Sequence, residues 1–255
     1  MSTSMSMTLY HGEPNGPSFT VLAALFEKGV RAELVRIDLA AGARHELPCA
    51  QQSAVAMSVE GEGPVLVVDG EGMTDSVFIA CYLDDVGGGA PLRPSDPYRR
   101  WETMAWCRQT IERTAPAAAF LGCRAHPPKA DPRLLGKIGS ADLRWRWEMM
   151  GAGVFADEQL ADSRSKIAAA VEKNEARLDG RSWLMGEFTI ADLESYAWLA
   201  AMVRLVPDAF AGQVRTAAWM ERIKGRAAVR KALSLATVAD PTAYWAPGPE
   251  INRWG

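Results

Sequence analysis

The stretch Phe188-Thr-Ile-Ala-Asp-Leu193 predicts the start of a buried helix. Thr189 stands where an N-cap hydroxyl would accept an early backbone N–H, and Asp192, three residues on, can accept the N-cap N–H in return, which makes a capping box. Phe188 and Leu193 occupy the two positions of a hydrophobic staple. The run that follows, 196–203, is too apolar for a surface helix. We therefore expect a buried helix in the last third of the chain.

The first 85 residues predict strands and helices in the order β-α-β-(α)-β-β-α. Short apolar or alternating runs indicate the strands, and apolar residues at helical spacing indicate the helices. The strands are expected at Met7–Tyr10, Glu33–Asp38, Pro64–Val68 and Met73–Thr74, and the helices at Ser18–Gly29 and Asp75–Asp84. Together with the capped helix, this order resembles the glutathione S-transferase family. The resemblance implies an α+β fold, with a thioredoxin-like N-terminal domain followed by an all-α C-terminal domain.

A segment rich in glycine and proline, 87–97, divides the chain. We expect a glutathione-binding domain over residues 1–86, a linker over 87–96 and an all-helical substrate domain over 97–255. In the helical domain, Pro116 should kink or end the helix that begins near Pro97. The last segment, from Asp240 onward, is rich in breakers and aromatic residues. It is expected to pack across the body or a partner, because free tails are usually polar.

Composition excludes several classes of function. With 48% hydrophobic and 23% charged residues and a net charge of -3, the chain has no electrostatic case for binding nucleic acid or an anionic membrane. No apolar run reaches the ~18 residues of a transmembrane helix, and the first residues lack the features of a signal peptide. The four cysteines and three histidines lack the spacing of a metal or redox site. We expect a cytoplasmic protein with reduced thiols and no metal.

A glutathione S-transferase must bind glutathione and lower the pKa of its thiol, which is ~8.5 for a free thiol. A helix N-terminus and a hydroxyl or amide donor both favour the thiolate. The loop that contains Asn15 and Ser18 precedes the first predicted helix. The resemblance makes Ser18 the first candidate for the catalytic donor to sulfur and Asn15 the second. On the residues alone, either is equally an ordinary cap of that helix.

Asp75 and Ser76 begin the next helix. In this family an acidic residue and a serine at this place bind the γ-glutamyl end of glutathione, so Asp75 would meet the ammonium and Ser76 the carboxylate. Without the family, the pair is a helix cap. Gly63 and Pro64 lie where the family places a cis-proline whose main chain binds the tripeptide. The family usually has Val where this chain has Gly63, which makes the segment looser.

Longer matches point to one branch of the family. The runs Ser18–Gly29, Tyr82–Val86, Leu92–Arg100 and Leu143–Arg146 are similar to bacterial β-etherases of the lignin-degrading type. Those enzymes use glutathione to attack the Cβ of an α-keto β-aryl ether and release a phenol. In that branch Asn and Ser are adjacent at the sulfur, whereas here Asn15 lies three residues before Ser18. Either Asn15 reaches the sulfur from a rearranged loop, or Ser18 acts alone, or the chain is catalytically weak.

The resemblance places the site for an aromatic small-molecule substrate between the two domains. Its candidate lining residues are Trp106, Arg113, Phe120, Trp145 and Trp147, although a single Trp is more often part of a core. Two other functions stay open. One is a glutathione S-transferase of another reaction class, such as a dehalogenase or an isomerase. The other is a weakly catalytic subunit that stabilises a partner. The resemblance implies a homodimer or a heterodimer with a paralogue.

Overall fold

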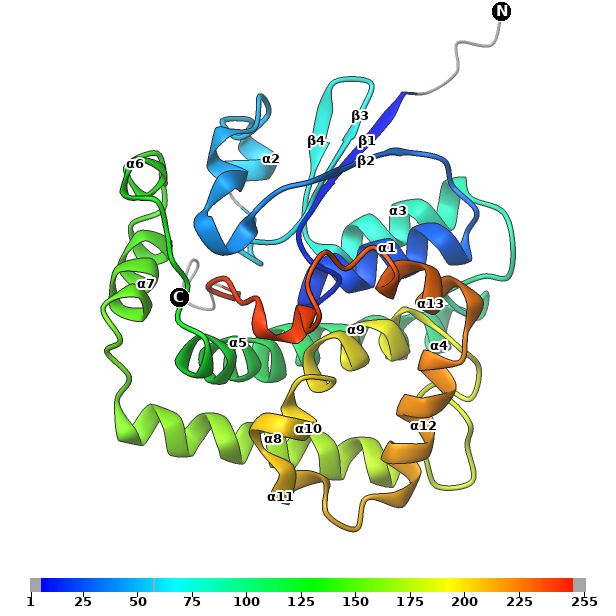
Figure 1. Ribbon diagram of the computed structural model, residues 1–255. Coiled ribbons are helices and arrows are strands. Elements are labelled where there is room, and N and C mark those ends of the chain that lie inside the picture. The colour runs from blue at the N-terminus through cyan, green and yellow to red at the C-terminus, as the bar shows by residue number, and fades with distance from the viewer. Residues whose placement is uncertain (1–5, 57, 250–255) are drawn as a thin grey trace, which may run out of the picture.

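The computed structural model describes residues 6–56 and 58–249, in which a mixed sheet and its helices lie against a larger helical part (Figure 1). Within these ranges four strands form one sheet in the order β2-β1-β3-β4. β2 runs parallel to β1 and β3 runs antiparallel to it, with Leu9 opposite both Leu34 and Leu66. The strands are β1 (Met7–His11), β2 (Glu33–Arg36), β3 (Val65–Val68) and β4 (Glu71–Met73).

The helices α1 (Gly16–Glu27) and α3 (Ser76–Val86) lie between the sheet and the helical part (Figure 1). Their apolar side chains share one buried cluster with Leu9 and Leu66 of the sheet. The short helix α2 (Ser53–Ala56) packs beside β4. The burial of α1 and α3 explains their apolar composition. The predicted thioredoxin-like arrangement of the sheet and its helices is confirmed.

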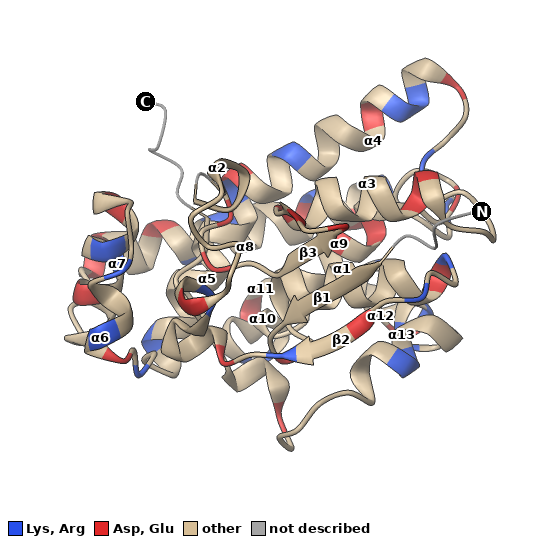
Figure 2. Ribbon diagram, turned by 90° about the horizontal axis from the view of Figure 1, so that it is seen from above, with Lys and Arg blue, Asp and Glu red and all other residues tan. Residues whose placement is uncertain are grey.

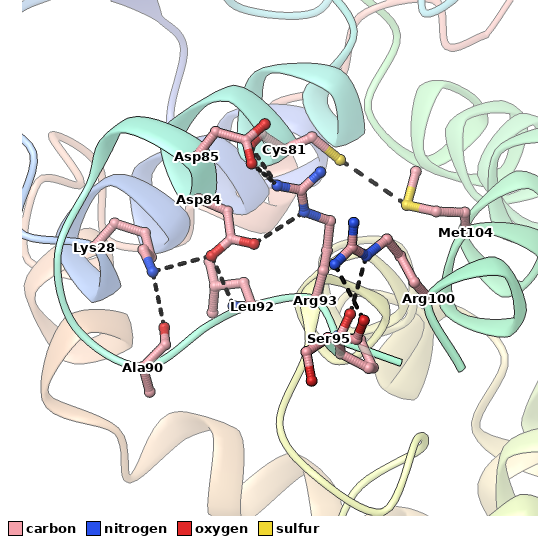
Figure 3. A network of polar contacts seen from close by, with 11 residues as sticks. Lys28, Cys81, Asp84, Asp85, Ala90, Leu92, Arg93, Ser95, Arg100 and Met104 are labelled. Atoms are coloured by element: carbon pink, nitrogen blue, oxygen red, sulfur yellow. Dashed lines mark hydrogen bonds and ion pairs between the residues drawn. The ribbon is translucent and has the colours of Figure 1, made fainter. Parts of the chain in front are cut away.

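Charged groups fix the segment between α3 and the helical part (Figure 3). The Asp84 carboxylate accepts bonds from the Lys28 ammonium at 3.0 Å, the Leu92 N–H at 2.8 Å and the Arg93 Nε at 2.9 Å. Burial alone would raise the pKa of Asp84, but these hydrogen bonds outweigh it and hold the pKa below its usual value. Lys28 also donates to the Ala90 carbonyl at 3.0 Å. The segment 87–96 is therefore tied to both α1 and α3.

The helical part begins with a helix that passes through Pro116. α4 (Pro97–Gln109) continues as a π-helical turn, Thr110–Thr114, and then as α5 (Ala115–Ala125). Pro116 has no N–H to give to the helix ladder, and the wider turn just before it carries the chain past that position. The helix is thus interrupted near Pro116 as predicted, but it does not end there.

The helix α9 (Ile190–Leu199) packs against α1, α4, α5 and α12, and all of its residues are buried. Thr189 and Asp192 form the predicted capping box, with the Thr189 N–H donating to Asp192 at 2.9 Å. Acidic and basic residues are interspersed along the helices in Figure 2. The other helices are α6 (Pro132–Leu135), α7 (Ala141–Gly151), α8 (Asp157–Arg177), α10 (Met202–Leu205), α11 (Pro207–Phe210), α12 (Val214–Lys224) and α13 (Ala227–Leu233).

After α13 the chain returns across α5 to the N-terminal part (Figure 1). We call residues 237–249 the C-terminal strap. The Thr237 N–H donates to the Glu13 carboxylate at 3.0 Å, and Trp245 is buried against α5. A Cβ atom on Gly122 would lie 2.1 Å from the Trp245 ring, so only glycine allows this close approach. The strap packs across the body as predicted, while residues 250–255 of the predicted tail lie outside the described residues.

Candidate active site

A cleft opens at the N-terminal end of α1, and we call it the α1 cleft. Its walls come from the loop between β1 and α1, the segment after β2, the segment before β3, one side chain of α9 and the C-terminal strap. The sheet positions the first three walls, because β1 and β2 are parallel and end at the same edge. The lining of this cleft includes Asn15, Ser18, Glu60, Glu62, Trp198, Tyr244 and Trp245.

Ser18 is 1% exposed and lies in the first turn of α1. Its Oγ accepts the Gly12 N–H at 2.9 Å. A hydroxyl that accepts one bond keeps its own proton for donation. The N-terminal end of α1 adds a positive partial charge at the same place. Ser18 can therefore donate to an anion in the cleft, which is the chemistry that a thiolate requires.

Asn15 is the N-cap of α1, but its side chain does not cap the helix. Instead its Nδ2 donates to the Tyr244 carbonyl of the C-terminal strap at 2.9 Å. The two residues predicted for the sulfur site thus line one cleft, and they differ in what they bind. The Asn15 amide holds the strap, whereas the Ser18 hydroxyl proton remains for a ligand.

The residues predicted for the γ-glutamyl site do not line the α1 cleft. Ser76 is fully buried, and its Oγ contacts one carboxylate oxygen of Glu60 and one of Glu194, the latter at 3.0 Å. Asp75 has a φ of 66° and accepts the Ser58 hydroxyl at 2.8 Å and the Glu60 N–H at 3.0 Å. Asp75 and Ser76 therefore hold the segment 58–60, and Glu60 is the side chain between them and the cleft.

The carboxyl groups of Glu60 and Glu194 both contact the Ser76 hydroxyl. One hydroxyl can donate to only one carboxylate, so the other carboxyl must carry a proton and donate to Oγ. Burial raises the pKa of Glu194 too, but Glu194 also accepts the Thr20 hydroxyl at 2.8 Å and the Trp198 indole at 2.7 Å, and these bonds favour its ionised form. Burial raises the pKa of Glu60 well above its usual value, and the charges of Glu194 and Asp75 add to this shift. We therefore assign the proton to Glu60.

Glu60→Gln tests this assignment, because glutamine keeps the shape of the protonated acid. A raised folded-state pKa stabilises the protein fully below the unfolded value of about 4.3, and that contribution is lost as the pH rises through the folded pKa. We expect the free energy of unfolding of the wild type to fall for this reason as the pH rises above about 4.3, and to fall less in Glu60→Gln. Urea unfolding at stepped pH measures it, with the exposed Glu172→Gln as the control. Equal slopes in wild type and Glu60→Gln would contradict the assignment.

Gly63 makes room for Glu60. A Cβ atom on Gly63 would lie 2.6 Å from Glu60 Oε2, so the valine usual in the family would displace this carboxyl. The predicted cis bond at Pro64 is wrong, since the Gly63–Pro64 peptide is trans. Arg44 contributes to this difference, because its buried guanidinium donates to the Gly61 carbonyl and, at 3.1 Å, to the Gly63 carbonyl. The main chain before Pro64 is thereby held in the trans form that X–Pro bonds prefer.

A second buried carboxylate, Glu62, lines the same cleft. Its Oε1 accepts the Trp147 indole at 2.8 Å and lies 2.5 Å from His45 Nε2. The other oxygen of Glu62 and Oε2 of Glu60 are buried without a hydrogen-bond partner among the described residues. Buried polar atoms without partners are rare in proteins. The two oxygens therefore mark the wall between β2 and β3 as a place where a ligand donor would bind.

The five residues predicted for the aromatic substrate do not form one site. Trp106 and Arg113 line a separate cavity between α4, α8 and α9. Phe120 is buried with its ring 5.3 Å from Phe155, Trp147 is buried on Glu62, and Trp145 is 59% exposed on α7. The aromatic residues that line the α1 cleft are instead Trp198, Tyr244 and Trp245. Sequence reasoning missed these three, and it also missed Glu60, Glu62 and Glu194.

Comparisons with known proteins identify the class. Residues 5–85 match the family model described as "Glutathione S-transferase, N-terminal domain". The chain is 27% identical over 248 residues to Protein LigF of a Sphingobium species, covering 89% of this chain and 93% of LigF. It is 26% identical over 238 residues to a glutathione S-transferase of Silene vulgaris, covering 88% of this chain and 96% of that protein. Residues 5–85 therefore form a glutathione S-transferase N-terminal domain.

A solved structure shows the same fold. The crystal structure of the β-etherase LigF from Sphingobium superposes with a TM-score of 0.79 at 24% identity, over 90% of this chain and 99% of that chain. This likeness establishes the fold of both parts together. In the described part of the chain, no helix combines the length and apolarity needed to cross a membrane.

Proposed function

We propose that this protein is a glutathione-dependent transferase that cleaves β-aryl ether bonds in lignin-derived aromatics. One observation carries the proposal: a buried hydroxyl with a proton to donate, that of Ser18, lies at a helix N-terminus in a cleft with aromatic walls. The similarity to LigF over most of both chains supports the choice of substrate. Glutathione is the co-substrate and an aromatic small molecule is the acceptor.

The proposed reaction is a displacement at carbon. The thiol loses its proton to solvent on binding, and the thiolate attacks the Cβ of an α-keto β-aryl ether. A C–S bond forms, the Cβ–O bond breaks, and its electron pair leaves on the phenolate oxygen, which then takes up a proton. The adjacent ketone activates Cβ. The protein would supply thiolate stabilisation through Ser18 and alignment of the two reactants.

Glutathione binding is proposed at Asp75, Ser76 and the main chain beside Gly63 and Pro64, next to the α1 cleft. Because Ser76 contacts Glu60 in this structure, the γ-glutamyl carboxylate would replace the Glu60 carboxyl there. Ser76→Ala should then weaken glutathione binding by roughly tenfold, the cost of one hydrogen bond to a charged group. Isothermal calorimetry measures this change, and equal affinities for wild type and variant would refute the assignment.

The acceptor is proposed to bind against Trp198 and Trp245, because these rings lie 6.4 Å apart at the cleft. Trp245→Ala should raise the KM for an aromatic acceptor by about tenfold, since a buried aromatic contact contributes ~1–2 kcal/mol. The affinity for glutathione should stay within about twofold. Trp145→Ala, at an exposed ring that sequence reasoning assigned to the substrate, is the matched control. A larger effect in Trp145→Ala would return the acceptor site to α7.

The deciding experiment for the reaction class is incubation with glutathione and a racemic α-keto β-aryl ether, followed by chiral analysis of what remains. We expect release of the phenol and a glutathione thioether. Conjugation of a generic electrophile without ether cleavage would favour a dehalogenase or isomerase type of transferase. Turnover that begins only on mixing with a paralogue would favour the heterodimer subunit.

A dimer is proposed from the surface of α3 and α4. Phe78, Tyr98 and Trp101 are each more than 60% exposed, and the rings of Tyr98 and Trp101 lie 5.4 Å apart. Large exposed apolar side chains often mark an interface. Whether the second subunit is a copy of this chain or a paralogue is a question for analytical ultracentrifugation of the protein alone. A cytoplasmic location is proposed on the resemblance to the glutathione S-transferase family.

A further inference from the structure

Trp245 of the C-terminal strap is a buried tryptophan whose indole N–H is unused. The residue is 4% exposed, and its Nε1 has no hydrogen-bond partner within residues 6–56 and 58–249. The indole N–H of a buried tryptophan usually has a partner. The three other buried tryptophans of the described ranges follow this rule, since each donates to a carboxylate. The pairs are Trp147–Glu62 at 2.8 Å, Trp198–Glu194 at 2.7 Å and Trp219–Asp192 at 2.8 Å.

The unused N–H belongs to the wall of the α1 cleft. Trp245 lines this cleft together with Ser18 and Trp198. Its ring packs against α5, where a Cβ atom on Gly122 would lie between 2.1 and 2.5 Å from the ring atoms Cδ2, Cε2 and Cγ. The centre of the Trp198 ring is 6.4 Å away. Nε1 is not among the atoms closest to Gly122, so this donor is left for a group in the cleft.

The strap holds the Trp245 ring in a fixed place relative to Ser18. The Asn15 amide donates at 2.9 Å to the Tyr244 carbonyl, directly before Trp245. On the other side of Trp245, a Cβ atom on Gly248 would lie 2.4 Å from a side-chain carbon of α5, so the backbone and the helix are in close contact there. The Asn15 amide therefore joins the loop that carries the sulfur donor to the residue with the unused N–H.

The ligand group that binds this N–H must be a hydrogen-bond acceptor, because an indole N–H only donates. The wall between β2 and β3 offers the opposite chemistry. Glu60 and Glu62 each have a buried carboxyl oxygen without a partner among the described residues. Such oxygens bind the donors of a ligand and repel its acceptors. An acceptor oxygen on a ligand in the cleft is thus directed away from this wall and toward Trp245.

We propose that the Trp245 indole N–H donates to the α-ketone oxygen of the aryl ether acceptor during the displacement at Cβ. This inference rests on the proposed function, which supplies an acceptor with a ketone next to Cβ. Negative charge spreads onto the ketone oxygen as the thiolate attacks, and a donor that is already in place stabilises it. The indole keeps its proton throughout. Ser18 and Trp245 thus bind the two ends of the reacting unit, which are the sulfur and the ketone oxygen.

Trp245→Phe tests the donor, because phenylalanine keeps an aromatic ring and removes the N–H. With an α-keto β-aryl ether, kcat should fall by about three- to tenfold, the effect of one neutral hydrogen bond, while KM stays within about twofold. Trp145→Phe, at the exposed ring of α7, is the matched control and should leave both constants unchanged. A change confined to KM in Trp245→Phe would overturn the proposal, because it would reduce the role of Trp245 to ring contact.

Two glutathione thioethers test the same contact without turnover. S-phenacylglutathione carries the ketone, and S-phenethylglutathione has a methylene group in its place. In calorimetry, the wild type should bind the ketone at least about threefold more tightly than the methylene ligand, and Trp245→Phe should lose this preference. The carbonyl stretch of bound S-phenacylglutathione, measured by infrared difference spectroscopy, should lie at lower frequency in the wild type than in Trp245→Phe.

The possible outcomes separate this inference from the proposed function. If the wild type binds both thioethers equally and the carbonyl stretch is the same in wild type and Trp245→Phe, the role of Trp245 is refuted while the glutathione site stands. If neither thioether binds the wild type, the glutathione site itself is refuted, and the role of Trp245 falls with it.

Discussion

Ser18→Ala is expected to raise the pKa of the thiol of bound glutathione and to slow turnover by roughly ten- to a hundredfold. Ser18 is buried, and its hydroxyl is held in place by the Gly12 N–H at 2.9 Å. A hydrogen bond to a charged group contributes about 1.5–3 kcal/mol, so its loss should raise the thiol pKa by about one to two units. The N-terminal end of α1 remains in the variant, and activity should not vanish.

The measurement is the thiolate absorbance of bound glutathione against pH, with turnover in the same samples. Asn15→Ala is the comparison, because Asn15 lines the same cleft but donates to the Tyr244 carbonyl. We expect it to loosen the C-terminal strap and to leave the thiol pKa close to that of the wild type. A normal pKa in Ser18→Ala with a raised one in Asn15→Ala would transfer the role to Asn15. No change in either variant would favour a subunit that stabilises a partner.

Local patterns were sufficient to predict most of the fold. The apolar run at β1 and the apolar spacing in α1 each reflect burial in one shared core, and such periodicity is visible in the sequence. The capping box of α9 was equally predictable, because both of its partners lie within four residues. The continuation of the helix through Pro116 was less predictable, because a π-helical turn has no sequence signature of its own.

The candidate site was predicted only in part, because its remaining residues meet through distant contacts. Glu60 stands in a polar, glycine-rich stretch that resembles a surface turn. It is buried because Gly63 leaves room for it and because its carboxyl contacts the Ser76 hydroxyl, which also contacts Glu194. Helical spacing likewise shows which face of a helix is apolar, but not which element covers that face. Trp147 is therefore in the core, although the resemblance made it a candidate for the substrate site.

The second large effect is expected at Asp192, where one carboxylate joins three segments of the helical part. Its oxygens accept the Leu184 N–H at 3.0 Å, the Thr189 N–H at 2.9 Å and the Trp219 indole at 2.8 Å. The Thr189 hydroxyl lies 3.3 Å away. The loop before α9, the start of α9 and α12 thus depend on the same buried side chain.

Asp192→Ala should lower the free energy of unfolding by about 3–5 kcal/mol, because it leaves buried N–H groups unpaired and opens a cavity. Asp192→Asn should lower the free energy of unfolding by less. Its amide oxygen can still accept hydrogen bonds from two of the donors, whereas its NH₂ group faces the third donor and cannot accept from it. Urea unfolding near neutral pH measures both, and the exposed Asp162→Ala should change stability by less than about 0.5 kcal/mol.

Burial raises the pKa of Asp192 to about 6, against the hydrogen bonds that lower it. Its contribution to stability therefore falls as the pH rises from about 4 to 6, and Asp192→Asn should remove that fall. A loss below about 1 kcal/mol in Asp192→Ala would show that water replaces the carboxylate at little cost, and that the capping box is not what holds α9 in place.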